Sequence, residues 1–233
     1  MRLLRYVQRF YGISKREAWD LIMEGKVRVN GEVVRQPMMV LKGDERVEVE
    51  KLEPKRFVNF VYVAFYKPRG YVVSKADRFN RTIYEILPEK FKDLNAVGRL
   101  DKDSEGLLLL TNDGNLIHRL THPKYGIRRG YVVEVDGKVD EGVVKGFLEG
   151  VEDRGEILRA VECKILGGNR LFVVLKTGKY REIRRMAEKF NLKVLRLKRV
   201  FYGNVKLDLE VGKWRYLRED EVKTLKSLVG MPP

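Results

Sequence analysis

The sequence of 233 residues contains few of the side chains that form disulfides or bind transition metals. It has one cysteine, Cys163, and two histidines, His118 and His122. A single cysteine excludes an intramolecular disulfide framework, and these three residues cannot complete a closed Cys/His zinc site. Any metal-dependent chemistry would therefore have to use carboxylates.

Long apolar runs are absent as well. No stretch approaches the ~20 residues of a membrane-spanning helix, and the basic N-terminus leads into no cleavable apolar segment. Hydrophobic residues make up 44% of the chain and charged residues 35%, which excludes a disordered chain and a membrane protein. We expect a soluble, cytoplasmic protein with one large domain, or a medium domain and a small one.

Acidic residues are too few to balance the basic ones, because 33 Asp and Glu face 48 Lys and Arg, a net charge of +15. Residues 164–206 alone contain 13 basic and 2 acidic side chains, and residues 1–56 have a net charge of +4. An ordinary thermophile-like surface is the alternative, favoured by the presence of only two glutamines, but such surfaces carry both signs. The localised excess predicts a polyphosphate partner, RNA or DNA.

The first 56 residues predict a compact module of two helices and a hairpin. An apolar stripe over Leu3–Phe10 predicts the first helix. The Ser-x-x-Glu spacing of residues 14–17 predicts that a second helix begins at Ser14, and Gly25 is placed to end it. Asn30-Gly31 between alternating segments predicts a type I′ hairpin. The polar stretch Lys51–Arg56 predicts a linker, which places the domain boundary between residues 56 and 57.

Residues 57–233 predict strands with interspersed helices. Because the helices do not alternate strictly with strands, the pattern favours an α+β fold over a doubly wound sheet. The predicted strands are Val58–Tyr66, Leu107–Leu110, Tyr131–Val135, Leu158–Ile165, Leu171–Lys176 and Lys193–Val200. The predicted helices are Arg81–Leu87, Asn115–Leu120, Asp140–Leu148, Arg181–Asn191 and Glu219–Val229.

The helix predicted at Arg181–Asn191 has an apolar face and a charged face. The charged face carries Arg181, Arg184, Arg185 and Glu188. Guanidinium groups suit bidentate phosphate contacts, so we expect this region to contact nucleic acid. A second basic area is predicted in the N-terminal module, whose cations include Arg2, Arg5, Arg9, Lys15, Arg16, Lys26 and Arg28.

Residues 97–114 carry the most conspicuous chemistry, because Asp101, Asp103 and Glu105 precede a buried-looking strand. These acids could be solvated loop residues. They could instead form a carboxylate cluster for Mg²⁺ in a nuclease. In the third interpretation Asp101 is a single catalytic carboxylate, presented by a loop that begins at Gly98 and flanked by Arg99. The residues alone leave the three open.

The Gly-Arg-Leu-Asp sequence at 98–101, with Ser-Glu-Gly-Leu-Leu at 104–108 and Thr-Asn-Asp-Gly at 111–114, resembles the signature of ribosomal pseudouridine synthases. These enzymes act on small- and large-subunit RNA and carry an N-terminal S4 domain. Residues 66–70, 130–133 and 178–186 resemble the family's first, tyrosine and basic motifs, and residues 14–18 and 25–31 are S4-like. In the basic motif, Glu182 stands where glutamine is common, and Arg181 where histidine or tyrosine is usual.

The resemblance implies an S4-like RNA-binding module over residues 1–56. It implies a catalytic domain over residues 57–233 with a mixed, mainly antiparallel sheet and flanking helices. The implied reaction converts uridine to pseudouridine in ribosomal RNA without cofactor or metal. Asp101 would attack C1′ or abstract the 2′ proton, with Arg184 as its ion-pair partner and Arg181 as the fallback. Tyr131 would stack on the uracil and help to remove the C5 proton; a core strand tyrosine is the alternative.

The target base must leave its stack to reach Asp101, so base flipping is implied. Arg99 could fill the vacated space, or it could support the loop. The further expected RNA contacts are Arg2, Arg5, Lys15, Arg16, Lys26, Lys67, Arg69, Arg181 and Arg185. We expect a monomer that acts on 23S rRNA or a pre-ribosomal particle. The alternatives are 16S rRNA as substrate, a non-catalytic RNA-binding or ribosome-assembly protein and, more distantly, a metal-dependent nuclease.

Overall fold

The computed structural model describes residues 1–41, 45–52 and 60–232. The chain divides into two units, Met1–Asn59 and Phe60–Pro233. The predicted boundary between residues 56 and 57, and the linker beyond Leu52, lie outside the described residues. Within the described part of the chain, no helix has both the length and the apolar character needed to cross a membrane.

The first unit packs two helices, α1 (Leu3–Tyr11) and α2 (Lys15–Met23), with a three-stranded sheet. The sheet has the order β2-β1-β3, formed by β1 (Val27–Val29), β2 (Glu32–Val33) and β3 (Val47–Val49). The Ser14 hydroxyl accepts a hydrogen bond from the Glu17 amide at 3.1 Å, which confirms the predicted helix start. Asn30 and Gly31 have φ values of 52° and 87°, which confirms the predicted hairpin turn.

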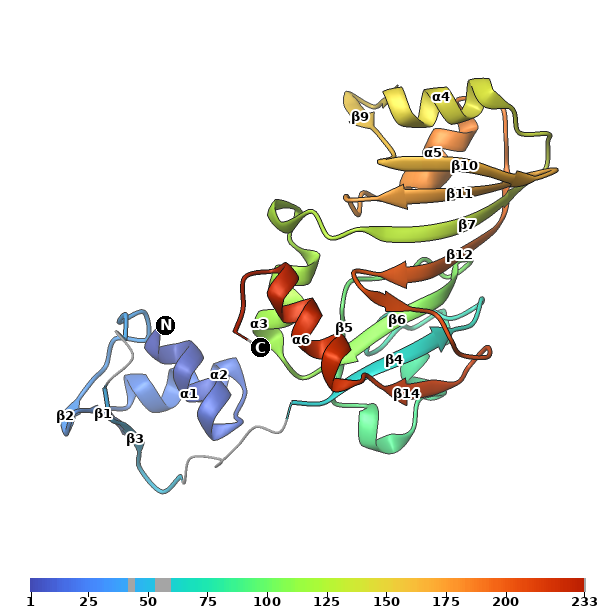
Figure 1. Ribbon diagram of the computed structural model, residues 1–233. Helices are drawn as coiled ribbons and strands as arrows, with labels where there is room; N and C mark the ends of the chain where they lie inside the picture. The colour runs from blue at the N-terminus through green and yellow to red at the C-terminus, as the bar shows by residue number, and fades with distance from the viewer. Residues whose placement is uncertain (42–44, 53–59, 233) are drawn as a thin grey trace. The chain divides into compact units, whose positions relative to one another are not determined.

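The second unit is organised around a nine-stranded sheet (Figure 1). Its order is β10-β11-β7-β12-β6-β4-β14, with β13 paired to β12 and β5 to β6. The strands are β4 (Tyr62–Lys67), β5 (Asn95–Ala96), β6 (Glu105–Thr111), β7 (Arg129–Val135), β10 (Glu162–Gly167), β11 (Arg170–Leu175), β12 (Val194–Tyr202), β13 (Val205–Lys206) and β14 (Trp214–Tyr216). The pairing of β12 with β6 is parallel and the other pairings are antiparallel. The predicted α+β fold with a mixed, mainly antiparallel sheet is confirmed.

The remaining elements of this unit flank or extend the sheet. The helices are α3 (Gly114–Thr121), α4 (Glu141–Glu149), α5 (Glu182–Glu188) and α6 (Glu219–Leu228). Short 3₁₀ turns lie at η1 (Ile83–Glu85), η2 (Glu89–Phe91) and η3 (Pro123–Tyr125), and β8 (Val151–Asp153) pairs with β9 (Glu156–Leu158) in a separate hairpin. Figure 1 shows α4 and α5 beside β10 and β11, and α3 beside α6.

Strand β6 is covered on both faces. Successive side chains of a strand point to opposite faces, so Leu107 and Leu109 pack in one apolar cluster with α3 and α6. Leu108 and Leu110 pack in another with the 3₁₀ turns η1 and η2. The run of four leucines is therefore explained by a central strand without a solvent face.

The two halves of the sheet meet where β6 runs parallel to β12, with Gly106 opposite Arg199. Gly106 has φ of +109°, and a Cβ atom at this position would lie 2.3 Å from the Arg199 carbonyl oxygen. Only glycine permits this close approach of the two backbones. The junction therefore fixes the position of the chain directly after the conspicuous acidic segment.

Several predicted elements have different bounds in the structure. The helix predicted at Arg81–Leu87 is only the 3₁₀ turn η1, and the helix predicted at Arg181–Asn191 shortens to α5. The strand predicted at Leu158–Ile165 divides, because its first part pairs with β8 and its second part with β11. Residues 58 and 59 of another predicted strand lie outside the described residues, and β4 begins at Tyr62.

Candidate active site

Asp101 lies on the loop that connects β5 to β6, and hydrogen bonds from the buried Lys67 side chain fix the backbone of this loop. The Lys67 ammonium donates hydrogen bonds to the carbonyl oxygens of Asp101 at 3.0 Å and Ser104 at 2.7 Å, and also to that of Pro68. The Ser104 amide donates to the Asp101 carbonyl at 3.1 Å. The loop is thus held at Asp101 itself.

The prediction that Lys67 contacts phosphate is wrong, because its side chain is fully buried. Burial lowers the pKa of Lys67 to about 8, against the opposing charges of Asp101 and Asp103. A buried ammonium needs hydrogen-bond acceptors, and three carbonyl oxygens supply them. Lys67 therefore supports the Asp101 loop and does not reach a ligand.

The Asp101 carboxylate is half-buried and makes no hydrogen bond or ion pair within residues 1–41, 45–52 and 60–232. It lies close enough to Lys67 and Arg184 for its charge to raise the pKa of both, although burial lowers each pKa by more. The backbone of Asp101 is fixed, its carboxylate makes no hydrogen bond or ion pair among the described residues, and cations lie nearby. Such a carboxylate is suited to act as a nucleophile or base.

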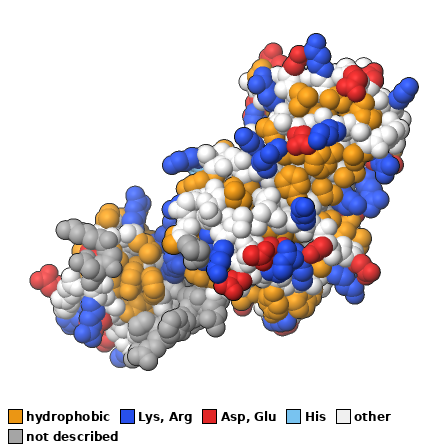
Figure 2. Space-filling view, viewed as in Figure 1, with side chains coloured by type: hydrophobic (Ala, Val, Ile, Leu, Met, Phe, Trp, Pro, Cys, Tyr) orange, Lys and Arg blue, Asp and Glu red, His pale blue; other side chains and the backbone are white. Residues whose placement is uncertain are grey.

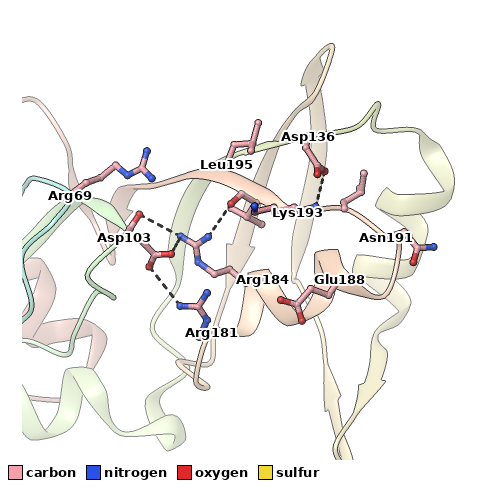
Figure 3. Close-up of a pocket in the computed structure, with 11 residues that line it drawn as sticks. Arg69, Asp103, Asp136, Arg181, Arg184, Glu188, Asn191, Lys193 and Leu195 are labelled. Carbon is pink, nitrogen blue, oxygen red and sulfur yellow. Dashed lines mark hydrogen bonds and ion pairs between the residues drawn. The ribbon is translucent and has the colours of Figure 1, made fainter.

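Arg184 lies beside Asp101 but forms its ion pair with Asp103. Its guanidinium is 3.1 Å from the Asp103 carboxylate and donates to the Val194 carbonyl at 3.1 Å (Figure 3). Arg181 approaches the other carboxylate oxygen of Asp103 at 3.7 Å. The predicted role of Arg184 as the positive charge that favours ionisation of Asp101 stays a prediction: the two charges interact, while the ion pair of Arg184 is with Asp103.

A cavity of about 590 Å³ opens next to this ion pair. In Figure 3, Asp103, Arg181 and Arg184 lie together on one side of the cavity, with Arg69 near Asp103. Its lining residues are Arg69, Asp103, Asp136, Arg181, Arg184, Glu188, Asn191, Leu192, Lys193, Val194 and Leu195. Asp101 and Tyr131 do not line it. The cavity thus joins the predicted basic motif to the exposed Arg69 of the first motif.

Tyr131 lies on β7 between β11 and β12, opposite Val173 and Arg199. Its side chain is 8% exposed and belongs to the same apolar cluster as Leu100, the residue before Asp101. This environment fits a core tyrosine, and the shared cluster connects the ring to the residue next to Asp101. The catalytic part assigned to Tyr131 stays a prediction.

Glu105, the last residue of the acidic segment, belongs to a hydrogen-bond network that does not include Asp101 or Asp103. Its carboxylate accepts hydrogen bonds from the Tyr66 hydroxyl at 2.7 Å and from the Arg196 guanidinium. Burial opposes ionisation of Glu105, but these two hydrogen bonds outweigh it and lower the pKa of the carboxyl. Burial and the same contact raise the pKa of Tyr66 to about 12. Asp103 and Glu105 therefore bind different arginines and do not converge on a common metal position with Asp101.

Arg185 does not lie on an exposed RNA-binding face as the sequence predicted. Its side chain is 10% exposed and pairs with Asp153 at 2.6 Å and Glu156 at 3.2 Å, both from the β8–β9 hairpin. Arg184 and Arg199 are buried too. Three of the 13 basic side chains of residues 164–206 are therefore buried, while seven are exposed. On the face shown in Figure 2, basic side chains lie in several separate groups with acidic ones among them.

Glu182, a departure from the family pattern, is also buried. Its carboxylate accepts hydrogen bonds from the Thr177 hydroxyl at 2.5 Å and the Lys179 amide at 3.1 Å. Burial raises the pKa of Glu182 in spite of these contacts. Because the Glu182 side chain is buried, we expect it to affect RNA binding only by positioning the 177–181 segment.

The other predicted RNA-binding cations are exposed. In the first unit these are Arg2, Arg5, Lys15, Arg16 and Lys26, and in the second unit Arg69 and Arg99. The Lys26 ammonium pairs with Glu24 at 2.6 Å, and this hydrogen bond raises the pKa of Lys26. The remaining six are exposed as a phosphate contact requires, and their role stays a prediction.

The fold and the site together define a class of protein. Asp101, whose carboxylate has no partner among the described residues, lies on a loop that Lys67 holds in place. Asp103, two residues further on, lines a cavity together with three arginines, and the N-terminal unit exposes further cations. This arrangement is suited to nucleophilic or acid–base chemistry on an anionic polymer. It does not depend on a disulfide, because the one cysteine is buried and unpaired.

Comparisons with known proteins agree with this class. Residues 61–189 match the RNA pseudouridylate synthase family, and residues 1–47 match the S4 domain. A crystal structure of a pseudouridylate synthase aligns with a TM-score of 0.71 at 31% identity, covering 97% of this chain and 99% of that one. The chain therefore belongs to the RNA pseudouridine synthase family, which confirms the resemblance seen in the sequence.

Three relatives span nearly the whole chain. An uncharacterized RNA pseudouridine synthase of Aquifex aeolicus is 39% identical, over 100% of this chain and 99% of its own length. The ribosomal large subunit pseudouridine synthase B of Bacillus subtilis is 34% identical, over 92% and 91%. The ribosomal small subunit pseudouridine synthase A of Vibrio cholerae is 33% identical, over 97% and 99%.

Proposed function

We propose that this protein converts specific uridines of ribosomal RNA to pseudouridine, with Asp101 as the catalytic carboxylate. The observation that carries the proposal is the state of Asp101: its backbone is held by Lys67 and Ser104 while its carboxylate has no partner among the described residues. Catalytic groups need this combination of fixed position and free functional atoms. Family membership supplies the reaction to which the carboxylate is applied.

The reaction is an isomerisation. The C1′–N1 bond of uridine breaks, the uracil turns, and a C1′–C5 bond forms; C5 then loses its proton and N1 gains one. Asp101 starts this sequence either by attacking C1′ or by taking the 2′ proton, and both routes require an ionised carboxylate. The guanidinium of Arg184 favours that state through its charge, although its ion pair is with Asp103. We assign to Tyr131 a role in the last step, the removal of the C5 proton.

The target uridine must leave its stack before it can reach Asp101, at a cost of about a few kcal/mol. Arg99 is exposed two residues before Asp101, and we assign its side chain to the space that the base vacates. The substrate segment is unpaired or loop RNA, because side chains cannot read bases in the deep groove of A-form RNA. Arg69 and Arg181, on the cavity, are assigned to the flanking phosphates.

Relatives named for the large and the small ribosomal subunit are equally similar to this chain, at 34% and 33% identity. The proposal therefore commits to ribosomal RNA as the substrate class, and the experiment uses transcripts from both subunits. The slight similarity of the Tyr131 region to large-subunit enzymes makes 23S rRNA the expected substrate.

The decisive experiment measures tritium release from 16S and 23S transcripts that contain C5-tritiated uridine. The wild-type protein should release tritium from one of them, and Asp101→Asn should abolish release while RNA affinity stays within about twofold. Asp103→Asn is the matched control, since it removes a neighbouring carboxylate that pairs with Arg184. It should slow release about tenfold without abolishing it, because a positioning contact is lost and the catalytic group remains.

Two results would contradict the proposal. If both variants lost activity equally, the assignment of Asp101, and not Asp103, as the catalytic carboxylate would fail. No release from any transcript by the wild type, combined with tight RNA binding, would favour a non-catalytic RNA-binding protein. Release that survives EDTA would further exclude a metal-dependent step.

A further inference from the structure

Phe79 is the most exposed large apolar side chain of the described residues, at 92%. It lies near the tip of a surface loop, residues 73–81, whose ends are joined at the base. The Val72 amide donates to the Arg81 carbonyl at 2.9 Å, and the Ile83 amide donates to the Val72 carbonyl at 3.0 Å. An aromatic ring in water contributes nothing to the stability of this loop.

The tip of this loop is fixed by hydrogen bonds to one carboxylate. Asp77 Oδ1 accepts from the Phe79 amide at 2.9 Å, the Asn80 amide at 2.8 Å and the Asn80 side-chain amide at 3.0 Å. These contacts, led by the Phe79 amide, lower the pKa of Asp77 and keep it ionised. The backbone that presents Phe79 is therefore set before any partner arrives, which reduces the entropy lost on binding.

The same loop is tied to the loop that carries Asp101. The Lys102 ammonium donates to Asn80 Oδ1 at 2.7 Å, and the Lys102 carbonyl accepts from the Gly70 amide at 2.7 Å. Lys102 follows Asp101 directly, and Asn80 follows Phe79 directly. Phe79 is thus presented by a segment in direct contact with the catalytic loop.

The charged side chains next to Phe79 in the sequence are two arginines and Asp77, whose carboxylate is occupied by the hydrogen bonds of the loop; one of the arginines, Arg81, also lies 3.8 Å from Glu85. Arg78 and Arg81, both exposed, flank the Phe79–Asn80 tip in the sequence, and the Arg81 guanidinium lies 4.8 Å from the centre of the Tyr71 ring. An exposed aromatic ring between cations is the pattern with which proteins bind single-stranded nucleic acid, because bases stack on the ring and phosphates meet the cations. An apolar protein partner would not require two guanidinium groups at the rim.

We propose that Phe79 stacks on an unpaired base of the substrate RNA close to the uridine that enters the site. The proposal rests on the proposed function for the identity of the RNA and adds a residue that holds the strand while the uridine is turned out. Stacking on a neighbouring base offsets part of the cost of unstacking the target. We treat Phe79 as a positioning residue, because its hydrocarbon ring has no group that can take part in the reaction.

The test compares Phe79→Ala, Phe79→Leu and Phe79→Trp. Binding is measured in the Asp101→Asn background, so that turnover cannot alter the probe, which is the 16S or 23S transcript from which the wild type releases tritium. Loss of one stacked base raises the Kd about 10-fold. Alanine and leucine should both show this rise, whereas tryptophan should bind within about twofold of phenylalanine, because only an aromatic ring offers a stacking face.

The control is Leu148→Ala, which removes another exposed apolar side chain, from α4, and should leave the Kd unchanged. Thermal unfolding should be unaltered in every Phe79 variant, since the ring is exposed. Alanine binding as tightly as phenylalanine would overturn the proposal, and leucine binding as tightly would replace stacking by a general apolar contact. If the wild type releases no tritium, the proposed function fails; the same binding series on the 23S transcript then decides separately whether Phe79 contacts RNA.

Discussion

Lys67→Met tests whether the Asp101 loop depends on a buried ammonium. Methionine has a similar length and fills the space, but it leaves the carbonyl oxygens of Pro68, Asp101 and Ser104 without this donor. At about 1–3 kcal/mol for a buried polar group that loses its partner, and with the Asp101 carbonyl still bonded to Ser104, the lost hydrogen bonds lower the free energy of unfolding by about 3 kcal/mol. Methionine also removes the cost of burying a charge, so the net fall should be smaller than this at pH 7 and should approach it as the pH rises. Tritium release should fall about 100-fold, because Asp101 loses its position.

The pH dependence isolates the charge of Lys67. Its pKa is about 8 in the folded protein and 10.5 without burial. Below pH 8 both states are protonated, and the folded state bears the full cost of the buried charge. Between pH 8 and 10.5 the unfolded chain binds more protons, so stability rises with pH. At about 1.4 kcal/mol per pKa unit, the gain approaches about 3–4 kcal/mol.

Urea unfolding of the wild type and Lys67→Met at pH 7, 8, 9 and 10 measures this gain as the difference between the two proteins. Other alkaline groups, such as Tyr66 and Cys163, titrate alike in both and cancel in the difference. The stability advantage of the wild type should therefore grow as the pH rises above 8. A difference that is constant from pH 7 to 10, or a variant with wild-type activity, would refute the role of Lys67 as a buried, charged clamp.

Two further substitutions test the framework of the site. Gly106→Ala places a Cβ atom 2.3 Å from the Arg199 carbonyl oxygen at a φ of +109°, so urea unfolding should show a loss of about 3–5 kcal/mol, and a loss below about 1 kcal/mol would mean that the two strands can separate freely. Arg185→Gln removes a buried partner of Asp153 and Glu156. It should lower the melting temperature and leave the RNA affinity of the folded protein within about twofold; an unchanged melting temperature with weaker binding would return Arg185 to the RNA interface.

Features encoded within a few residues were predictable from the sequence. The turn at Asn30-Gly31 and the helix start at Ser14 depend on backbone geometry and on a hydrogen bond across three residues, which neighbouring residues decide. The position of Asp101 followed from its motif. The support of Asp101 did not, because Lys67 is 34 positions away in the chain and its ammonium is aimed by the pairing of β4 with β6.

The helix α5 shows why periodicity misjudged the basic segment. Alternation of apolar and charged faces predicts a helix with one face in water. Here the apolar face packs with the sheet, and Arg185 on the other side meets the acidic residues Asp153 and Glu156 of the β8–β9 hairpin. The sequence contained both sets of charges, but only the tertiary structure shows that they neutralise each other.

The acidic segment 101–105 and the basic segment 164–206 therefore interact directly in the folded protein. Asp103 is paired with Arg184, and Glu105 with Arg196, so two of the three acids are satisfied by cations from the basic segment. Asp101 alone makes no such pair within the described residues. An excess of cations that only bound RNA would not need this pairing. We infer that part of the charge selects which carboxylate stays free to react, and that the exposed cations, such as Arg69, then bring the RNA to it.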